Sequence, residues 1–178
     1  MPKHVLLSSK QLRHTISRLA YQLIENHNNF SDTVIIGIQP RGAALANRLV
    51  KQLKSITGYD ITAGNLDITF HRDDFRHQTE LPQTHATDID FLTENKKVIL
   101  VDDVLYTGRT IRAAMEAMLD FGRPAEVELL TLIDRRYSRH LPIQPDYVGR
   151  VVDTISSQKV IVEWAENEGT DQVILLEN

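Results

Sequence analysis

Residues 98–110 read Val98-Ile99-Leu100-Val101-Asp102-Asp103-Val104-Leu105-Tyr106-Thr107-Gly108-Arg109-Thr110, and this stretch decides the fold. Four consecutive apolar residues, Val98 to Val101, are typical of a parallel strand that is buried on both faces. Two aspartates follow, and the turn from Tyr106 to Thr110 leads into residues with the apolar spacing of a helix. In sheets built from such strand-turn-helix units, ligands bind beyond the carboxyl ends of the strands.

The same alternation of strands and helices continues on both sides of this stretch. Residues 34–38 and 127–133 are further apolar runs, and the turn at 39–42 leads into a helix that Gly58 ends. An amphipathic helix is expected from about residue 9 to 27, after a capping box at Ser8 to Gln11. Shorter β-prone runs lie at residues 61–70, 147–152, 160–162 and 173–176, and residues 71–95 are predicted to form a polar loop or hairpin. The pattern predicts an α/β fold with a twisted parallel sheet flanked by helices, in a single domain over residues 1–178.

The composition excludes several classes of protein. The chain has 178 residues, of which 42% are apolar and 25% charged, as in an ordinary globular domain. It has no cysteine, which excludes disulfides, thiolate metal sites and a cysteine nucleophile, and fits a cytoplasmic protein. A net charge of −4 argues against a polycation that binds nucleic acid with its whole surface. We find no apolar run long enough for a membrane span and no signal peptide.

The segment after Val101 has the chemistry of a sugar-phosphate site. Asp102 and Asp103 can accept hydrogen bonds from vicinal hydroxyls or meet a hydrated Mg²⁺. The backbone N–H groups of the turn and of the helix N-terminus favour an anion, Thr107 and Thr110 add hydroxyl donors, and Gly108 allows close approach. The alternative is a solvated acidic turn before a helix. The coincidence of strand, acid pair and Thr-Gly-Arg-Thr in one segment favours the ligand site.

These residues also carry a resemblance. The segment resembles the motif with which type I phosphoribosyltransferases bind 5-phosphoribosyl 1-pyrophosphate (PRPP). Together with Gly122-Arg123-Pro124 and with residues 66–74, 141–143 and 146–149, it resembles the PyrR family, whose members are uracil phosphoribosyltransferases that also act as pyrimidine operon attenuation proteins. The resemblance implies the type I phosphoribosyltransferase fold with a small β-rich hood. It also implies PRPP, uracil and UMP as ligands, a homo-oligomer, and Mg²⁺ that is held mainly by PRPP.

The resemblance further assigns roles to residues of this sequence. The catalytic group is Asp102, Asp103 and Arg41. The group that binds PRPP and UMP is Pro40, Arg41, Asp102, Asp103, Val104, Leu105, Tyr106, Thr107, Gly108, Arg109 and Thr110. Arg72, Asp73 and Asp74 fall near the hood, residues 77–88 resemble a loop that closes over PRPP, and uracil maps to residues 151–155. Pro40 stands where the family usually has threonine, which removes a hydroxyl and a backbone donor.

Family members also bind hairpins in pyrimidine messenger RNA through a basic face. The corresponding positions here are Ser17, Tyr21, Arg139, Gln144 and Arg150. The glutamine lacks a charge for phosphate, whereas Arg135, Arg136 and Arg139 make a local basic cluster.

Three functions follow from these observations. The first is an enzyme that makes UMP from uracil and PRPP, with or without RNA binding. The second is an RNA-binding regulator that senses uridine nucleotides and has weak or no catalysis. The third is a phosphoribosyltransferase for a purine base, against which the family-specific segments argue.

Overall fold

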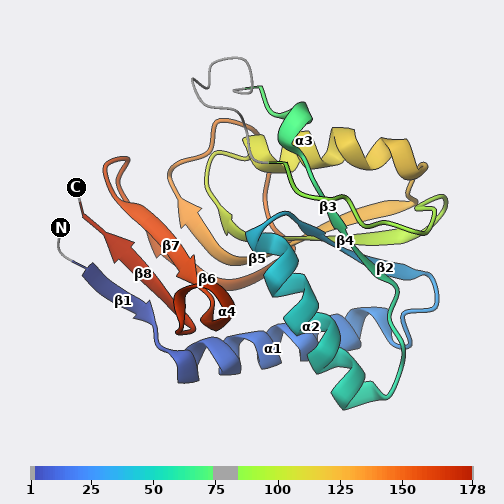
Figure 1. Cartoon of the computed structure of the whole chain (residues 1–178), viewed down its shortest axis with the longest axis horizontal. Coiled ribbons are helices and arrows are strands. Elements are labelled where there is room, and N and C mark those ends of the chain that lie inside the picture. The colour runs from blue at the N-terminus through green and yellow to red at the C-terminus, as the bar shows by residue number, and fades with distance from the viewer. Residues whose placement is uncertain (1–2, 74–83, 178) are drawn as a thin grey trace.

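The computed structural model describes residues 3–73 and 84–177. Its main sheet has five parallel strands in the order β3-β2-β4-β5-β6 (Figure 1). The strands are β2 (Thr33–Ile38), β3 (Ala63–Leu66), β4 (Lys97–Leu105), β5 (Glu126–Arg136) and β6 (Tyr147–Asp153). The predicted parallel sheet is therefore confirmed, and β4, which carries the acid pair, is its central strand.

Helices cover both faces of this sheet. On one face lie α1 (Ser9–His27) and α2 (Arg41–Thr57), and on the other lies α3 (Arg109–Met118) (Figure 1). In β4, Ile99 and Val101 pack in the core with α1 and α2, whereas Val98 and Leu100 pack in the core with α3. Because neighbouring side chains of a strand point to opposite faces, a continuous apolar run serves both cores at once.

Local signals set the helix ends as expected. Ser8 caps α1 and Gln11 returns the bond to the Ser8 backbone, which is the predicted capping box. Gly58 ends α2 in the left-handed conformation, with φ of 75°. The chain after α3 continues as the short 3-10 helix η3 (Leu119–Phe121) before Gly122.

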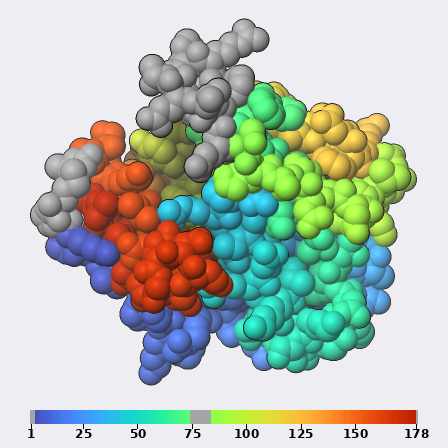
Figure 2. Space-filling view, viewed as in Figure 1, coloured from blue at the N-terminus to red at the C-terminus, as the bar shows by residue number. Residues whose placement is uncertain are grey.

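A second, antiparallel sheet joins the two ends of the chain and forms the expected hood. Its order is β1-β8-β7, with β1 (Lys3–Leu7), β7 (Lys159–Glu163) and β8 (Gln172–Leu176), and α4 (Ala165–Glu168) connects β7 to β8. In the space-filling view the red residues of this part lie against the blue-green residues of α2 (Figure 2). Arg48 of α2 contributes to this contact, since it pairs with Glu166 and with Asp171, 3.0 Å away.

One expectation from the sequence needs correction here. The β-prone run at 61–70 forms a strand only at Ala63–Leu66, and η1 (Thr69–His71) follows it. Arg72 and Asp73, which were expected near the hood, come directly after η1. Asp74 and residues 77–83 of the predicted loop lie outside the described residues. Within the described ranges, no helix has the length and apolar character that crossing a membrane requires.

Candidate active site

The strand order places two loops side by side at one edge of the sheet. The chain leaves β2 toward β3 on one side, and from β4 it proceeds through β5 and β6 on the other. The carboxyl ends of β2 and β4 are therefore neighbours where the order reverses, which is where open α/β sheets bind ligands. The loop after β2 carries Pro40 and Arg41, and the loop after β4 carries residues 106–108.

The acid pair lies inside β4, whereas the sequence suggested that the strand ends at Val101, directly before the pair. Strand β4 continues to Leu105 because it pairs with β5 as far as Asp134. Asp102 and Asp103 are consequently only 7% and 9% exposed, which excludes the solvated acidic turn. Asp102 Oδ1 accepts a hydrogen bond from the Asp103 N–H at 3.0 Å, and Asp103 Oδ1 accepts one from the Val104 N–H at 2.8 Å.

Burial governs the protonation of this pair. Loss of solvent raises the pKa of Asp102 well above its ordinary value, and the charge of Asp103 raises it further. Burial also raises the pKa of Asp103, although the nearby Arg41 charge and backbone hydrogen bonds oppose this. Two desolvated carboxylates side by side form a site that favours cations and hydroxyl donors.

A pocket of about 400 Å³ opens over the acid pair. Its charged lining includes Arg41 and Arg72. The charge of Arg72 lowers the pKa of Asp102 and the charge of Arg41 lowers that of Asp103, although burial outweighs both effects. Arg41, the first residue of α2, donates to the Val162 carbonyl in β7 and pairs with Glu168 at 3.5 Å, which ties it to the small sheet. The Gln39–Pro40 peptide bond in this loop is cis.

A second pocket of about 240 Å³ adjoins the first and lies over the turn into α3. Gly108, with φ of 90°, stands at the N-cap position of α3 and offers no side-chain cap. The Arg109 N–H donates to the Thr107 hydroxyl at 3.4 Å, and helix N-terminal N–H groups of this kind form a site that favours an anion. The pockets share Arg72, Asp102, Val104 and Thr110, and the second one also contains residues 105–109 and Ile111.

Six residues of the first pocket were not assigned to the site from the sequence, and three of them, Asp67, Thr69 and His85, are linked by hydrogen bonds. Asp67 accepts hydrogen bonds from the Thr69 N–H at 3.0 Å, the Thr69 hydroxyl at 2.6 Å and the His85 N–H at 3.1 Å. Burial alone would raise the pKa of Asp67, but these hydrogen bonds outweigh it and the pKa is lowered. Asp67 thus joins two segments that lie 18 residues apart in the chain. Its position within residues 66–74 was the available signal, but it does not reveal this role.

The polar residues near the second pocket are arranged differently from the expectation. Arg72 faces both pockets, and Asp73 forms ion pairs with Arg109 and, at 3.9 Å, with Arg112. Asp73 therefore lies beside the start of α3, and its charge offsets the cations there.

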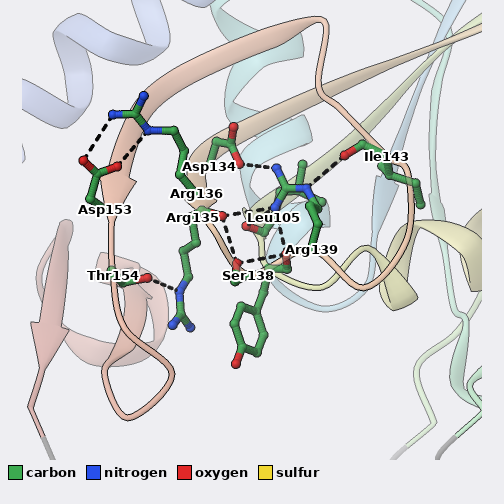
Figure 3. Close-up of polar contacts among 10 residues, drawn as sticks. Leu105, Asp134, Arg135, Arg136, Ser138, Arg139, Ile143, Asp153 and Thr154 are labelled. Carbon is green, nitrogen blue, oxygen red and sulfur yellow. Dashed lines mark hydrogen bonds and ion pairs between the residues drawn. The ribbon is translucent and has the colours of Figure 1, made fainter.

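The expected basic cluster is largely neutralised by neighbouring groups (Figure 3). Arg135 is buried and donates to the Thr154 hydroxyl at 2.9 Å and to carbonyls of the chain that follows. Arg136 forms two bonds with the Asp153 carboxylate, at 2.7 and 3.2 Å. Arg139 pairs with Asp134 and donates to the Tyr106 carbonyl at 2.7 Å.

The other residues assigned to RNA lie on α1 and β6, which pack against each other. Tyr21 is 55% exposed on α1. The Ser17 hydroxyl accepts a hydrogen bond from Gln52 of α2 at 3.2 Å, and Arg150 of β6 donates to the Leu6 carbonyl. Gln144 lies apart from them, beside Arg136 and Arg139.

The residues present fit a divalent cation that is shared with a substrate. Among residues 3–73 and 84–177 there is no group of three or more carboxylate, histidine or cysteine side chains that could hold a metal ion. The chain therefore supplies two adjacent carboxylates, Asp102 and Asp103, and a Mg²⁺ ion at this place would take most of its oxygen ligands from phosphate and water.

Comparisons with known proteins agree with this site. The model of the phosphoribosyl transferase domain family matches residues 6–167. A protein of Enterococcus faecalis named bifunctional protein pyrR is 43% identical over 175 residues, which cover 98% of this chain and 97% of that protein. The bifunctional protein PyrR of Bacillus subtilis is 41% identical over 178 residues, covering 99% and 98%.

Solved structures with the same fold are more distant in sequence. A hypoxanthine phosphoribosyltransferase from Staphylococcus aureus superposes with a TM-score of 0.72 at 21% identity, covering 98% of this chain and 92% of its own. The hypoxanthine phosphoribosyltransferase from Trypanosoma cruzi in complex with IMP gives 0.74 at 17% identity, covering 97% and 93%. The chain has the type I phosphoribosyltransferase fold, and it belongs to the PyrR family of phosphoribosyltransferases.

Proposed function

We propose that the protein transfers the 5-phosphoribosyl group of PRPP to uracil, forming UMP and pyrophosphate. The observation that supports this most directly is the pair of adjoining pockets at the carboxyl ends of β2 and β4, where the strand order reverses. One pocket has the backbone geometry for a phosphate, and the other has two carboxylates and two arginines. PRPP carries a phosphate, two ribose hydroxyls and a pyrophosphate in that order along the molecule.

The ribose 5-phosphate half would bind to β4 and the turn that follows. The N–H groups at the start of α3 and the hydroxyls of Thr107 and Thr110 would surround the 5-phosphate. Asp102 and Asp103 would accept hydrogen bonds from the two ribose hydroxyls. This arrangement fixes C1 of the ribose between the pyrophosphate and the base, and such orientation can contribute about 7–11 kcal/mol to catalysis.

Charge neutralisation on the leaving group is the main chemical task. The C1–O bond to pyrophosphate breaks, positive charge develops on the ribose ring, and a nitrogen of uracil forms the new bond at C1. Arg41 and Arg72 line the same pocket as the acid pair and would neutralise pyrophosphate oxygens. Mg²⁺, when bound with PRPP, supplies further positive charge to the pyrophosphate. The carboxylates of Asp102 and Asp103 would stabilise the charge on the ribose.

Uracil is proposed to bind to backbone groups at residues 151–155, as the resemblance implies. This segment is the end of β6, and two of its side chains are fixed by arginines: Asp153 by Arg136 and Thr154 by Arg135. Backbone donors and acceptors held in this way can distinguish bases by their hydrogen-bonding edges. The homo-oligomer that the resemblance implies is part of the same proposal.

The test is release of pyrophosphate from PRPP and Mg²⁺ with uracil, cytosine, hypoxanthine and guanine, each supplied separately. Release with uracil alone is the expected result, and release with a purine alone would replace uracil by the purine alternative. Folded protein that binds UMP without releasing pyrophosphate would support the nucleotide-sensing regulator.

A double variant, Asp102→Asn with Asp103→Asn, addresses the ribose assignment. Loss of two hydrogen bonds to charged groups, each worth about 1.5–3 kcal/mol, should lower kcat/KM by at least about a hundredfold. The control is Asp60→Asn, because the Asp60 side chain is 87% exposed and pairs with Lys54 at the surface. Full activity in the double variant would show that the ribose is held elsewhere.

We also propose RNA binding as a second function of the same chain. The supporting observation is a groove between α1 and α2 of about 380 Å³ whose lining includes Arg13, Ser17, Arg48 and Lys51. The test is binding of a pyrimidine leader hairpin at several salt concentrations, with and without UMP. Binding should weaken as salt rises, and Lys51→Gln should reduce the salt dependence by about one phosphate contact. Equal affinity for an unrelated hairpin would exclude a specific regulator.

A further inference from the structure

The backbone of the turn into α3 can bind an anion only if its N–H groups face the anion and its carbonyl oxygens point away from it. Every peptide unit carries one N–H and one carbonyl, so a backbone that binds an anion through N–H groups must turn its carbonyl oxygens away from it. Three carbonyls precede Gly108, namely those of Leu105, Tyr106 and Thr107. The hydrogen-bond donors to these three carbonyls therefore determine whether the N–H groups of the turn can face an anion.

All three carbonyls accept hydrogen bonds from the segment that follows β5. The Arg139 guanidinium donates through Nη1 to the Tyr106 carbonyl at 2.7 Å and to the Leu105 carbonyl at 3.4 Å. The Ser138 hydroxyl donates to the Tyr106 carbonyl at 3.2 Å. The N–H groups of residues 140 and 141 donate to the Thr107 carbonyl at 3.0 and 3.3 Å. One short segment, residues 138–141, therefore supplies hydrogen-bond donors to the carbonyls of residues 105–107, on the side of the turn that we call the outer side.

Arg139 is itself held from several directions. Its Nε donates to the Ile143 carbonyl at 2.9 Å, and Nη1 also lies 3.2 Å from the Arg135 carbonyl. Its Nη2 forms an ion pair with Asp134, whose side chain is only 13% exposed. Figure 3 shows the Arg139 guanidinium among Leu105, Asp134 and Ile143, with dashed lines to Asp134 and Ile143. A planar group with five N–H donors suits this arrangement, which a lysine ammonium could satisfy only in part.

We propose that Arg139 is a positioning residue for the 5-phosphate site. It acts through the Leu105 and Tyr106 carbonyls, which it holds on the outer side so that the N–H groups of the turn face the anion. The inference rests on the proposed function, because the anion is the 5-phosphate of PRPP or UMP. It gives Arg139 a role other than the RNA contact that the resemblance implied.

Two other arginines provide a comparison. Arg18 of α1 is exposed and, like Arg139, donates to backbone carbonyls, but these are the carbonyls of Val148, at 3.3 Å, and Gly149 in β6. Arg135 lies over the Tyr106 ring with 4.0 Å between its guanidinium carbon and the ring centroid, so it supports the same turn through a side chain. Substitution of Arg139 removes the carbonyl contacts and leaves this stacking in place.

The experiment measures binding of ribose 5-phosphate by calorimetry, because this probe carries the phosphate without any base. The variants are Arg139→Met, Arg139→Lys and, as the control, Arg18→Gln. We expect Arg139→Met to weaken ribose 5-phosphate binding at least tenfold and Arg139→Lys to weaken it less. Arg18→Gln should bind ribose 5-phosphate as the wild type does. In turnover, KM for PRPP should rise more than kcat falls, and amide hydrogen exchange at residues 106–110 should become faster in Arg139→Met.

The outcomes separate the inference from the function on which it rests. Wild-type protein that does not bind ribose 5-phosphate would overturn the proposed function and this role together. Wild-type binding with unchanged affinity in Arg139→Met would overturn the positioning role alone, and simultaneous loss of RNA hairpin binding would return Arg139 to the RNA face. If Arg139→Met does not fold, the Lys variant decides, since unchanged affinity and unchanged exchange there would also contradict the role.

Discussion

Gly42 of α2 lies directly against the backbone of β4, and replacing it by alanine tests how the two loops of the site are brought together. A Cβ atom at this position would lie 2.4 Å from the Val101 carbonyl oxygen and 3.0 Å from the Asp102 Cα. Carbon and oxygen atoms of neighbouring backbones normally approach to about 3.3–3.6 Å. The start of α2 or the centre of β4 must therefore move by about 1 Å.

The expected losses of stability and of PRPP affinity in Gly42→Ala follow from the displacement of these backbone atoms. Overpacking of a close-packed interior destabilises by about 1–3 kcal/mol. For a chain of this length that corresponds to a fall in Tm of about 2–12 °C. Displacement of the Asp102 carboxylate should also remove one charge-assisted hydrogen bond to the ribose, which lowers PRPP affinity by about ten- to a hundredfold.

Thermal unfolding and calorimetric titration with PRPP and Mg²⁺ measure both effects. Gly58→Ala is the matched control, because Gly58 has a φ of 75° but nothing lies within 4 Å of an added Cβ. That variant should lose about 1–2 kcal/mol through backbone strain alone and bind PRPP normally. Normal PRPP binding by Gly42→Ala would refute the reasoning, because it would mean that the contact with β4 does not position the acid pair.

Three further predictions concern stability. Ser8→Ala removes the side-chain cap of α1 and should lower the free energy of unfolding by about 1 kcal/mol in denaturant titration. Leu49→Ala, at a fully buried position of α2, should lower it by about 2–5 kcal/mol in the same assay. Because burial raises the pKa of Asp102, the folded protein binds this proton more tightly than the unfolded chain does. Stability of the ligand-free protein should thus fall as pH rises from about 3.9 through the raised pKa. In thermal unfolding across this pH range, Asp102→Asn should make the decrease of stability with pH smaller. An unchanged dependence of stability on pH would contradict the raised pKa of Asp102.

The parts of the fold that depend on nearby residues could be predicted from the sequence. The cap at Ser8, the end of α2 at Gly58 and the apolar run that begins β4 are local signals, and each lies where it was expected. The turn between β4 and α3 was predicted for the same reason, since its residues are consecutive. Periodicity and turn chemistry act over a few residues, which is the range that a single sequence reveals.

The rest depends on partners that are distant in the chain. β4 extends through Asp102 and Asp103 because Val104 and Leu105 pair with β5, and this pairing buries carboxylates that looked exposed. The contacts of the Arg139 side chain could not be predicted either, because the sequence gives its charge but not the carbonyls that surround it. Likewise Arg72 reaches the pocket through the path of the chain after β3, which no local pattern specifies.

The pairing of β1 with β8 has a consequence for the order in which the molecule can be assembled. Lys3 of β1 is the partner of Leu176, so this ladder must wait until the last strand has left the ribosome, whereas all strands of the parallel sheet have been made by Asp153. Domains assemble during synthesis as their parts emerge, and contacts of long sequence separation form late. A nascent chain would thus possess the turn into α3 before Arg41 meets the Val162 carbonyl of β7. The turn into α3 can thus form early, whereas Arg41 becomes fixed only after β7 has been made.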